Sequence, residues 1–383
     1  MAVNNNFYAA INDLVAKATG GTTAVITDYS SFIDAGKKIT DILYTDLQNN
    51  FISALMNRIA LVINTARGYE GAYRELERGS LEYGNTIEMI INKFYEAQAA
   101  PFVALTDGYS VDQYVVKKPD VDAHYYTNTD AYQLVITIQY DQLKKAWESP
   151  ASMDAFIQNV IMYVMNSNEL RREAGRIALV ADLIVRDLSE TAASTIDTPA
   201  QVYKLLTLYN GIAGTSLTAS EALYNEEFIR FAVKTINMVV EKTKKVSKSY
   251  NNDGIMTFTR PEDRHLFVNS VLVSALGAYV FPNAYNKDDQ ITLNNYINVP
   301  YWQAEDHPLT VKYFDDDVAG DEATTDPVLA VMCDRYAIGE YIRKQDMRSS
   351  PFNAAGEYFN NFLNVEVAYV SCPAANSVVF TLA

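Results

Sequence analysis

The feature of this sequence that most constrains its fold is a long helical pattern beginning at Ser149-Pro150. Serine is a preferred N-cap residue, and proline fits the first helical turn, where its missing N–H group has no partner to lose. Continued unbroken to Leu188, the helix would be roughly 55–60 Å long at 1.5 Å per residue, which favours an elongated molecule. Apolar residues recur in it at helical spacing: Met153, Phe156, Ile157, Val160, Ile161 and Val164, then Ala174, Ile177, Ala178, Ala181, Ile184 and Val185.

The polar patch Asn166–Arg172 interrupts this apolar stripe, and either a bend in the helix or exposure to solvent would account for it. The segment before the helix, residues 131–140, is the clearest strand in the chain. Apolar and aromatic residues alternate there with polar ones, which predicts a sheet with one buried face. The residues on the expected buried face are Tyr132, Leu134, Ile136, Ile138 and Tyr140.

Residues 66–92 are dense in charge and contain four glycines. They predict a two-stranded excursion that turns near Gly79-Ser80. A two-stranded ribbon has little stability alone, so it needs another surface to lie on. Complementary charges would fix its register on a partner subunit, and a solvated surface hairpin is the alternative. The candidate contact residues are Arg67, Glu70, Arg74, Glu75, Glu77, Arg78 and Glu82.

The remaining segments predict a mixed α and β chain. Residues 1–30 are polar and Gly/Thr-rich, which indicates an arm or loop, and Ser31–Met56 has helical spacing. The short apolar run Ile59–Ile63 suits a buried strand. Beyond Asn251, short strands and helices alternate. The chain is expected to end in two strands, Val365–Ser371 and Ser377–Leu382.

The residues with catalytic potential form no recognisable site. The three histidines have no metal-ligand spacing, and the acidic run Asp315–Asp317 lacks the alternating ligands and the glycine of a calcium loop. Phosphate-binding glycine motifs and nucleophile elbows are absent. The net charge of −16 opposes non-specific binding to nucleic acid, although it permits a protein that merely encloses it. No apolar run reaches the length of a membrane span. The sequence therefore predicts a non-enzyme without cofactor or metal, and its 27 tyrosines are typical of interfaces.

The order of these elements resembles the major capsid proteins of tailed bacteriophages, which have the Hong Kong 97-type fold. The best local match is residues 132–164, where an alternating strand and a short helix precede the long one. The resemblance implies an α+β fold in which a peripheral domain carries a long spine helix, an extended loop reaches over the adjacent subunit, and an axial domain surrounds the capsomer centre. The implied boundaries are an N-terminal arm at 1–30, a peripheral domain at 31–65, 94–188 and 356–383, an extended loop at 66–93, and an axial domain at 189–355.

The resemblance also implies a function, that of a structural protein assembling into the icosahedral shell around a tailed-phage DNA genome. Its partners would be copies of itself in hexamers and pentamers, a separate scaffolding protein and a portal, with DNA enclosed without sequence-specific contacts. It would reside in the virion after assembly in the cytoplasm of the bacterial host. Residues 66–92 contain no lysine and Lys93 lies at their base, so a covalently crosslinked shell is not expected. The alternatives are an encapsulin-type nanocompartment shell and an enzyme with an unrecognised acidic site.

Overall fold

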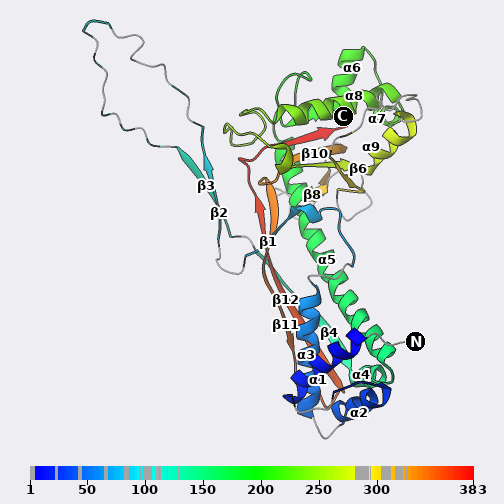
Figure 1. Ribbon diagram of the computed structural model, residues 1–383. Coiled ribbons are helices and arrows are strands. Elements are labelled where there is room, and N and C mark those ends of the chain that lie inside the picture. The colour runs from blue at the N-terminus through cyan, green and yellow to red at the C-terminus, as the bar shows by residue number, and fades with distance from the viewer. Residues whose placement is uncertain are drawn as a thin grey trace.

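The computed structural model of the chain shows an elongated body with a two-stranded ribbon projecting from it (Figure 1). The structure describes residues 5–21, 25–41, 45–63, 68–81, 86–94, 97, 106–108, 110, 114, 116, 118, 120–127, 129–280, 293, 295–302, 312–314, 322–324 and 327–383. Helix α5 and a four-stranded sheet run along the body, and a second sheet with its own helices forms the upper end in Figure 1.

Helix α5 (Pro150–Leu188) confirms the predicted long helix, with 39 residues and no break. The Ser149 side chain accepts a hydrogen bond from the backbone N–H of Ser152, and Pro150 occupies the first turn. At 1.5 Å per residue the helix is about 58 Å long. It lies close to the neighbouring sheet at Gly175, where a β-carbon would collide with the Tyr369 hydroxyl.

The four-stranded sheet has the order β1 (Glu77–Ser80), β11 (Ile338–Ser349), β12 (Tyr358–Ser371) and β4 (Thr129–Gln139). β1 pairs with β11 in parallel, and the other neighbours are antiparallel. β4 has the predicted alternation, with Ile136 and Ile138 buried. Strand β11, which forms a long hairpin with β12, was not predicted, because its charged residues hide the alternation that identifies a strand.

Four helices pack at the lower end of the body in Figure 1: α1 (Asn5–Thr19), α2 (Tyr29–Ile39), α3 (Thr45–Ile63) and α4 (Tyr140–Ala146). The prediction of an irregular arm at residues 1–30 is wrong for α1, since Ile11, Leu14, Val15 and Ala18 form an apolar helix face buried in the core of this end. The predicted strand at 59–63 is also wrong, because those residues continue α3.

The upper end contains a five-stranded sheet and the helices that pack on it. The strand order is β5 (Val202–Lys204), β13 (Ser377–Thr381), β10 (Val328–Asp334), β6 (Arg264–Asn269) and β7 (Ile297–Val299). The helices are α6 (Leu205–Ala213), α7 (Ala219–Ala222), α8 (Glu226–Lys242) and α9 (Ser270–Ala275), the last followed by a π-helical turn at Leu276–Val280. Two short strands, β8 (Lys312–Phe314) and β9 (Glu322–Thr324), pair with each other.

The sheets divide the chain differently from the expected boundaries. β11, expected within the axial segment 189–355, belongs to the sheet beside α5. The tail 356–383, expected to return to the peripheral domain, does so only through β12, because β13 lies in the five-stranded sheet. β13 is buried along its whole length between β10 and β5. A strand buried along its whole length carries no sign of which of two sheets it joins.

The projecting ribbon consists of β2 (Ile87–Asn92) and β3 (Val121–Tyr126), paired antiparallel from Ile87 with Tyr126 to Asn92 with Val121. Of the excursion predicted at 66–93, only β2 belongs to this ribbon, and the predicted turn at Gly79-Ser80 is wrong. Those two residues lie in β1, inside the body. The ribbon begins near Thr86, and the chain between its strands runs from Lys93 to Asp120, which includes three lysines. The absence of lysine from residues 66–92 therefore gives no reason to exclude a covalently crosslinked shell.

Candidate functional site

A buried cluster of charges lies where the polar patch interrupts the stripe of α5. Arg172 donates from Nε and Nη2 to the two carboxylate oxygens of Glu340 on β11, at 2.8 and 3.2 Å. Arg176 also donates from Nε to Glu340, and from Nη1 to Glu169 at 2.6 Å. Arg176 and Glu340 are both completely buried. Buried charges of this kind are tolerated only when each has its partners, so the cluster fixes β11 against the middle of α5.

The segment before β1 crosses α5 at the same place. The backbone N–H of Tyr69 donates to Asn166 Oδ1 at 2.9 Å, and that of Ala72 donates to Glu173 Oε1 at 3.2 Å. Glu77 then reaches Arg172, with 2.9 Å between its Oε2 and Nη2.

The helix continues through the polar patch without a break. Asn168 and Arg172 are buried there, whereas Leu170 and Arg171 are exposed, so only part of the patch faces solvent. The patch binds the crossing segment, and the i, i+4 pair of arginines inside an apolar helix was the sequence signal for it.

The charged residues predicted to contact a partner have contacts within the chain. Arg74 pairs with Glu70, and Glu75 lies 3.3 Å from Nδ1 of His265. Arg78 donates from Nη2 to the backbone oxygen of Ile338 at 3.0 Å. Glu77 belongs to the buried cluster described above. The last two predicted residues, Arg67 and Glu82, lie outside the described residues.

The ribbon has two unlike faces. Its inner face carries Met89, Ile91 and Tyr126, which pack on a small buried cluster of Ile255, Cys372 and Ala374 in the body. At the same base, His124 Nε2 lies 3.2 Å from the carboxylate of Asp253. These contacts hold the root of the ribbon to its own chain.

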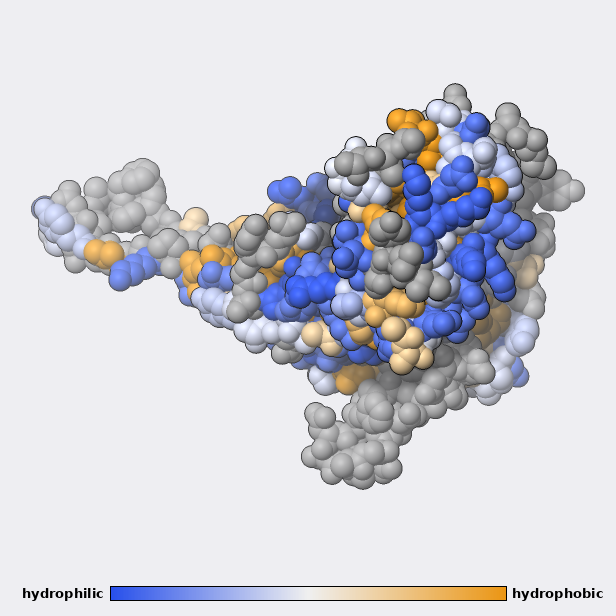
Figure 2. All heavy atoms as spheres, turned by 90° about the horizontal axis from the view of Figure 1, so that it is seen from below, coloured by the Kyte–Doolittle hydropathy of each residue, from blue (hydrophilic) through white to orange (hydrophobic). Residues whose placement is uncertain are grey.

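The outer face of the ribbon combines exposed apolar side chains with Glu88, whose carboxylate accepts a hydrogen bond from the Tyr125 hydroxyl at 3.0 Å. Ile90 is 60% exposed and Tyr125 62%, and Val121 on the same face is 47% exposed. Figure 2 shows apolar residues, in orange, along the part that projects from the body. Exposed apolar side chains gathered on one projecting element are typical of a surface that another protein covers.

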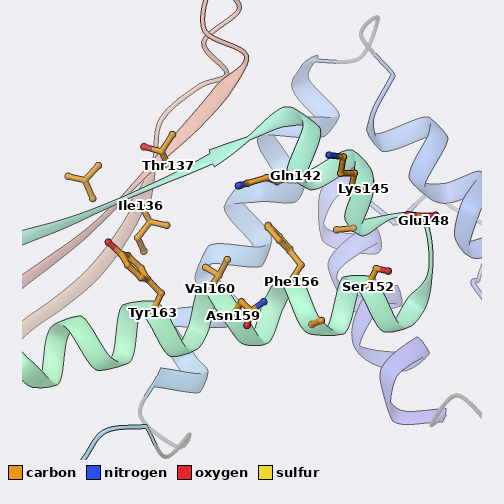
Figure 3. A pocket seen from close by; sticks show the side chains of 13 residues that line it. Ile136, Thr137, Gln142, Lys145, Glu148, Ser152, Phe156, Asn159, Val160 and Tyr163 are labelled. Carbon is orange, nitrogen blue, oxygen red and sulfur yellow. The ribbon is translucent and has the colours of Figure 1, made fainter.

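An open groove of about 760 Å³ lies between β4, α4 and the first half of α5 (Figure 3). Phe156, Val160 and Tyr163 point from α5 toward β4, and Ile136 points back toward the helix. Tyr163 is 60% exposed, and Val135 at the rim is 48% exposed. Lys145 and Glu148 bring charge to the end of the groove near α4.

The carboxyl group of Asp187, near the end of α5, is fully buried, and its oxygens accept no hydrogen bond from the described residues. Arg186 Nε lies 3.7 Å from its Oδ1. Burial raises the pKa of Asp187 to about 7 from the usual 3.8. At pH values between these two pKa values, the carboxyl group of Asp187 keeps its proton in the folded chain and loses it in the unfolded chain.

Stability should therefore fall as the pH rises. The free energy of unfolding is expected to decrease between about pH 4 and pH 7, with a slope of up to about 1.4 kcal/mol per pH unit from this group, and the contribution becomes constant above that window. Urea unfolding across this range should show that the Asp187→Asn variant lacks this component. Asp154→Asn, an exposed change on the same helix, should keep it. An unchanged slope in Asp187→Asn would remove Asp187 as its source.

The described residues contain no cluster of histidine, cysteine and carboxylate side chains that could hold a metal ion. The acidic run Asp315–Asp317 lies outside them. Both cysteines, Cys333 and Cys372, are buried free thiols. None of the described helices combines the length and apolar character needed to cross a membrane.

Comparison with known proteins identifies a family. The family model for the Phi29-like phage major capsid protein matches residues 11–381. The major capsid protein of Bacillus phage B103 is 24% identical over 87% of this chain and 64% of its own length. That of Streptococcus phage Cp-1 is 24% identical over 64% of this chain and 63% of its own length. This chain thus spans somewhat less than two thirds of these relatives.

Among solved structures, a chain in the capsid of Staphylococcus phage Andhra has a TM-score of 0.50 at 9% identity, covering 83% of this chain and 86% of that one. At that identity the likeness concerns the fold alone. The prediction of an α+β fold of the Hong Kong 97-like capsid type is confirmed.

Proposed function

Because the chain belongs to the Phi29-like phage major capsid protein family, we propose that it assembles with copies of itself into the closed shell of a phage capsid. The observation that carries this proposal is the ribbon of β2 and β3, whose outer face exposes Ile90, Val121 and Tyr125 in the single chain. A ribbon of two strands gains stability when it lies on another surface. A neighbouring copy supplies that surface in a shell.

We also propose a finer organisation for this shell. The subunits form hexamers and pentamers around a DNA genome, assembled in the host bacterial cytoplasm with a separate scaffolding protein and a portal, and the shell becomes part of the virion. The charge of −16 suits a wall that encloses DNA without sequence-specific contacts, because tight binding to phosphates requires basic residues. The chain catalyses no reaction in this role.

The ribbon takes over the inter-subunit role first assigned to residues 66–93. Of the candidate contact residues, Glu77 and Arg78 are engaged within the chain. Glu70, Arg74 and Glu75 remain partly exposed and can still meet a neighbour at the root of the ribbon. Exposed pairs of this type stabilise little, so they would select the partner more than hold it.

The encapsulin-type alternative is not favoured, because the similar curated proteins are major capsid proteins of phages. Sedimentation of the expressed chain, followed by nuclease treatment, tests the proposal. Large particles that protect DNA when formed in the phage host support it. Particles that carry an enzyme and no DNA would favour the nanocompartment, and a chain that never exceeds small oligomers would contradict both.

A further inference from the structure

The turn that follows helix α8 carries the densest run of cations in the chain. Residues 242–248 contain four lysines and no carboxylate, and no other seven consecutive residues contain as many lysines and arginines. Helix α8 ends at Lys242, so the run begins where the helix dipole favours positive charge. The dipole acts only within the last turn of a helix, so it accounts for Lys242 better than for Lys248.

Backbone hydrogen bonds hold this turn beside the segment that returns from it. Ser247 and Thr257 exchange both of their backbone hydrogen bonds at 3.0 Å, and the N–H of Thr259 donates to the Thr243 oxygen at 3.0 Å. Arg260 follows Thr259 directly, so its backbone lies next to the end of α8. The lysines and Arg260 therefore come from two adjacent segments of one surface, at the upper end of the body in Figure 1.

Ion pairs within the chain use only some of these cations. Lys242 Nζ lies 3.0 Å from Asp197 Oδ1. Lys244 and Arg264 share the carboxylate of Glu241. Three further cations are exposed and have no ion pair among the described residues, and together we call them the basic patch: Lys245, Lys248 and Arg260.

The net charge of −16 does not cancel the field of the basic patch. At 0.1 M salt, charges are screened over about 10 Å, whereas α5 alone is about 58 Å long. Carboxylates elsewhere along the body are therefore largely screened from the patch. Glu262 and Asp263 are closer, because they follow Arg260 along the chain. The two lysines are thus expected to contribute most of the field.

The surroundings of the basic patch suit a phosphate polyanion better than a folded protein. Specific protein interfaces are built around a few aromatic or arginine anchors that fill pockets. Between the two lysines, only Val246 offers exposed apolar surface, and it is 43% exposed. Lysine is a point charge on a flexible stem, which suits a repetitive backbone that is bound without its sequence being read.

We propose that Lys245, Lys248 and Arg260 bind the phosphate backbone of the enclosed DNA. The inference rests on the proposed shell function and names the residues through which the wall meets its contents. A single copy binds weakly, because it neutralises only about three phosphates. A shell repeats the contact in every copy, so many weak contacts act on one DNA molecule.

Titration of a short labelled DNA duplex with the soluble chain tests the contact. The logarithm of the binding constant should fall with the logarithm of the salt concentration, with a slope of about −3 between about 50 and 200 mM salt. The triple variant Lys245→Gln, Lys248→Gln and Arg260→Gln should bind about tenfold more weakly or worse at the lowest salt, and it should lose most of this slope.

The matched control removes the same charge elsewhere. Lys17→Gln, Lys37→Gln and Lys38→Gln together change three exposed lysines on α1 and α2 and give the same net charge as the triple variant. The control should bind DNA within about twofold of the unaltered chain, and both variants should keep its circular dichroism spectrum. Equal losses in the two variants, or no binding by the unaltered chain at low salt, would overturn the inference.

Formaldehyde treatment of DNA-filled particles tests the contact inside the shell. Mass spectrometry of the peptides should find nucleotide adducts on Lys245 or Lys248 and none on Lys37 or Lys38. The triple variant should form particles at the yield of the unaltered chain, since the partner is DNA. A tenfold loss of particles would instead assign the basic patch to an acidic surface of a neighbouring copy and would overturn the inference.

The outcomes separate this inference from the shell function. Filled particles without adducts on the basic patch would overturn the DNA contact and leave the shell function intact. An unaltered chain that forms no particles would overturn the shell function, and the duplex titration would still decide whether the basic patch binds phosphate.

Discussion

Replacing Glu340 with glutamine is expected to lower the free energy of unfolding by about 3–5 kcal/mol. Glu340 is completely buried and accepts hydrogen bonds from both Arg172 and Arg176. A neutral amide of the same shape cannot balance the charge of either guanidinium group, so Arg172 and Arg176 keep only the more exposed carboxylates of Glu77 and Glu169 as charged partners. The loss is large because the most deeply buried contact of both arginines weakens at once.

Urea unfolding followed by circular dichroism measures this loss. The matched control is Arg74→Gln, which breaks the solvent-exposed pair with Glu70 and should cost less than about 1 kcal/mol. Equal stability of Glu340→Gln and the unaltered chain would show that the cluster does not fix β11 to α5.

Removing the ribbon is expected to abolish shell formation without unfolding the chain. Glu88 and Tyr125 are direct partners across the ribbon, so an Asn-Gly turn can replace Met89–His124 and close a short hairpin. The buried cluster on α5 and both large sheets lie outside the replaced segment. The shortened chain should therefore keep its fold and lose only the element that reaches a neighbour.

Sedimentation and circular dichroism together check this expectation. The shortened chain should sediment as a folded monomer or small oligomer. His124→Gln serves as the control, because it removes the imidazole that contacts Asp253 at the ribbon root and leaves the outer face unchanged. That variant should still form particles. Closed particles from the shortened chain would contradict the role given to the ribbon.

The spine and its preceding strand could be predicted because their signals are local. The cap at Ser149, the proline after it and the apolar stripe all lie within the helix itself. The alternation of β4 is likewise complete within its own residues. Patterns of this kind identify an element even when its partners are unknown.

The position of the ribbon could not be predicted because its signals are not local. Charge and glycine at residues 66–92 indicated an exposed excursion, but the partner of Arg78 is Ile338, 260 residues away. Those charges belong to contacts that fix β1 and β11 to α5. Deleting residues 71–83 from the segment 66–93, which was predicted to form the ribbon, would remove Glu77 from the buried cluster and destabilise the body.

The groove between β4, α4 and α5 could not be predicted from the sequence either. It depends on which end of the four-stranded sheet β4 occupies, and sheet order is set by pairings among strands far apart in the chain. The predicted strand at residues 131–140 covers β4 except for Thr129 and Asp130. The sequence carried no sign that one edge of that strand remains open.

Negative-stain electron microscopy of the purified chain, produced in the phage host together with the genes that flank it, tests the central claim most directly. Closed particles of uniform size, built from this chain, are the expected result. Monomers or small oligomers at every protein concentration would contradict it.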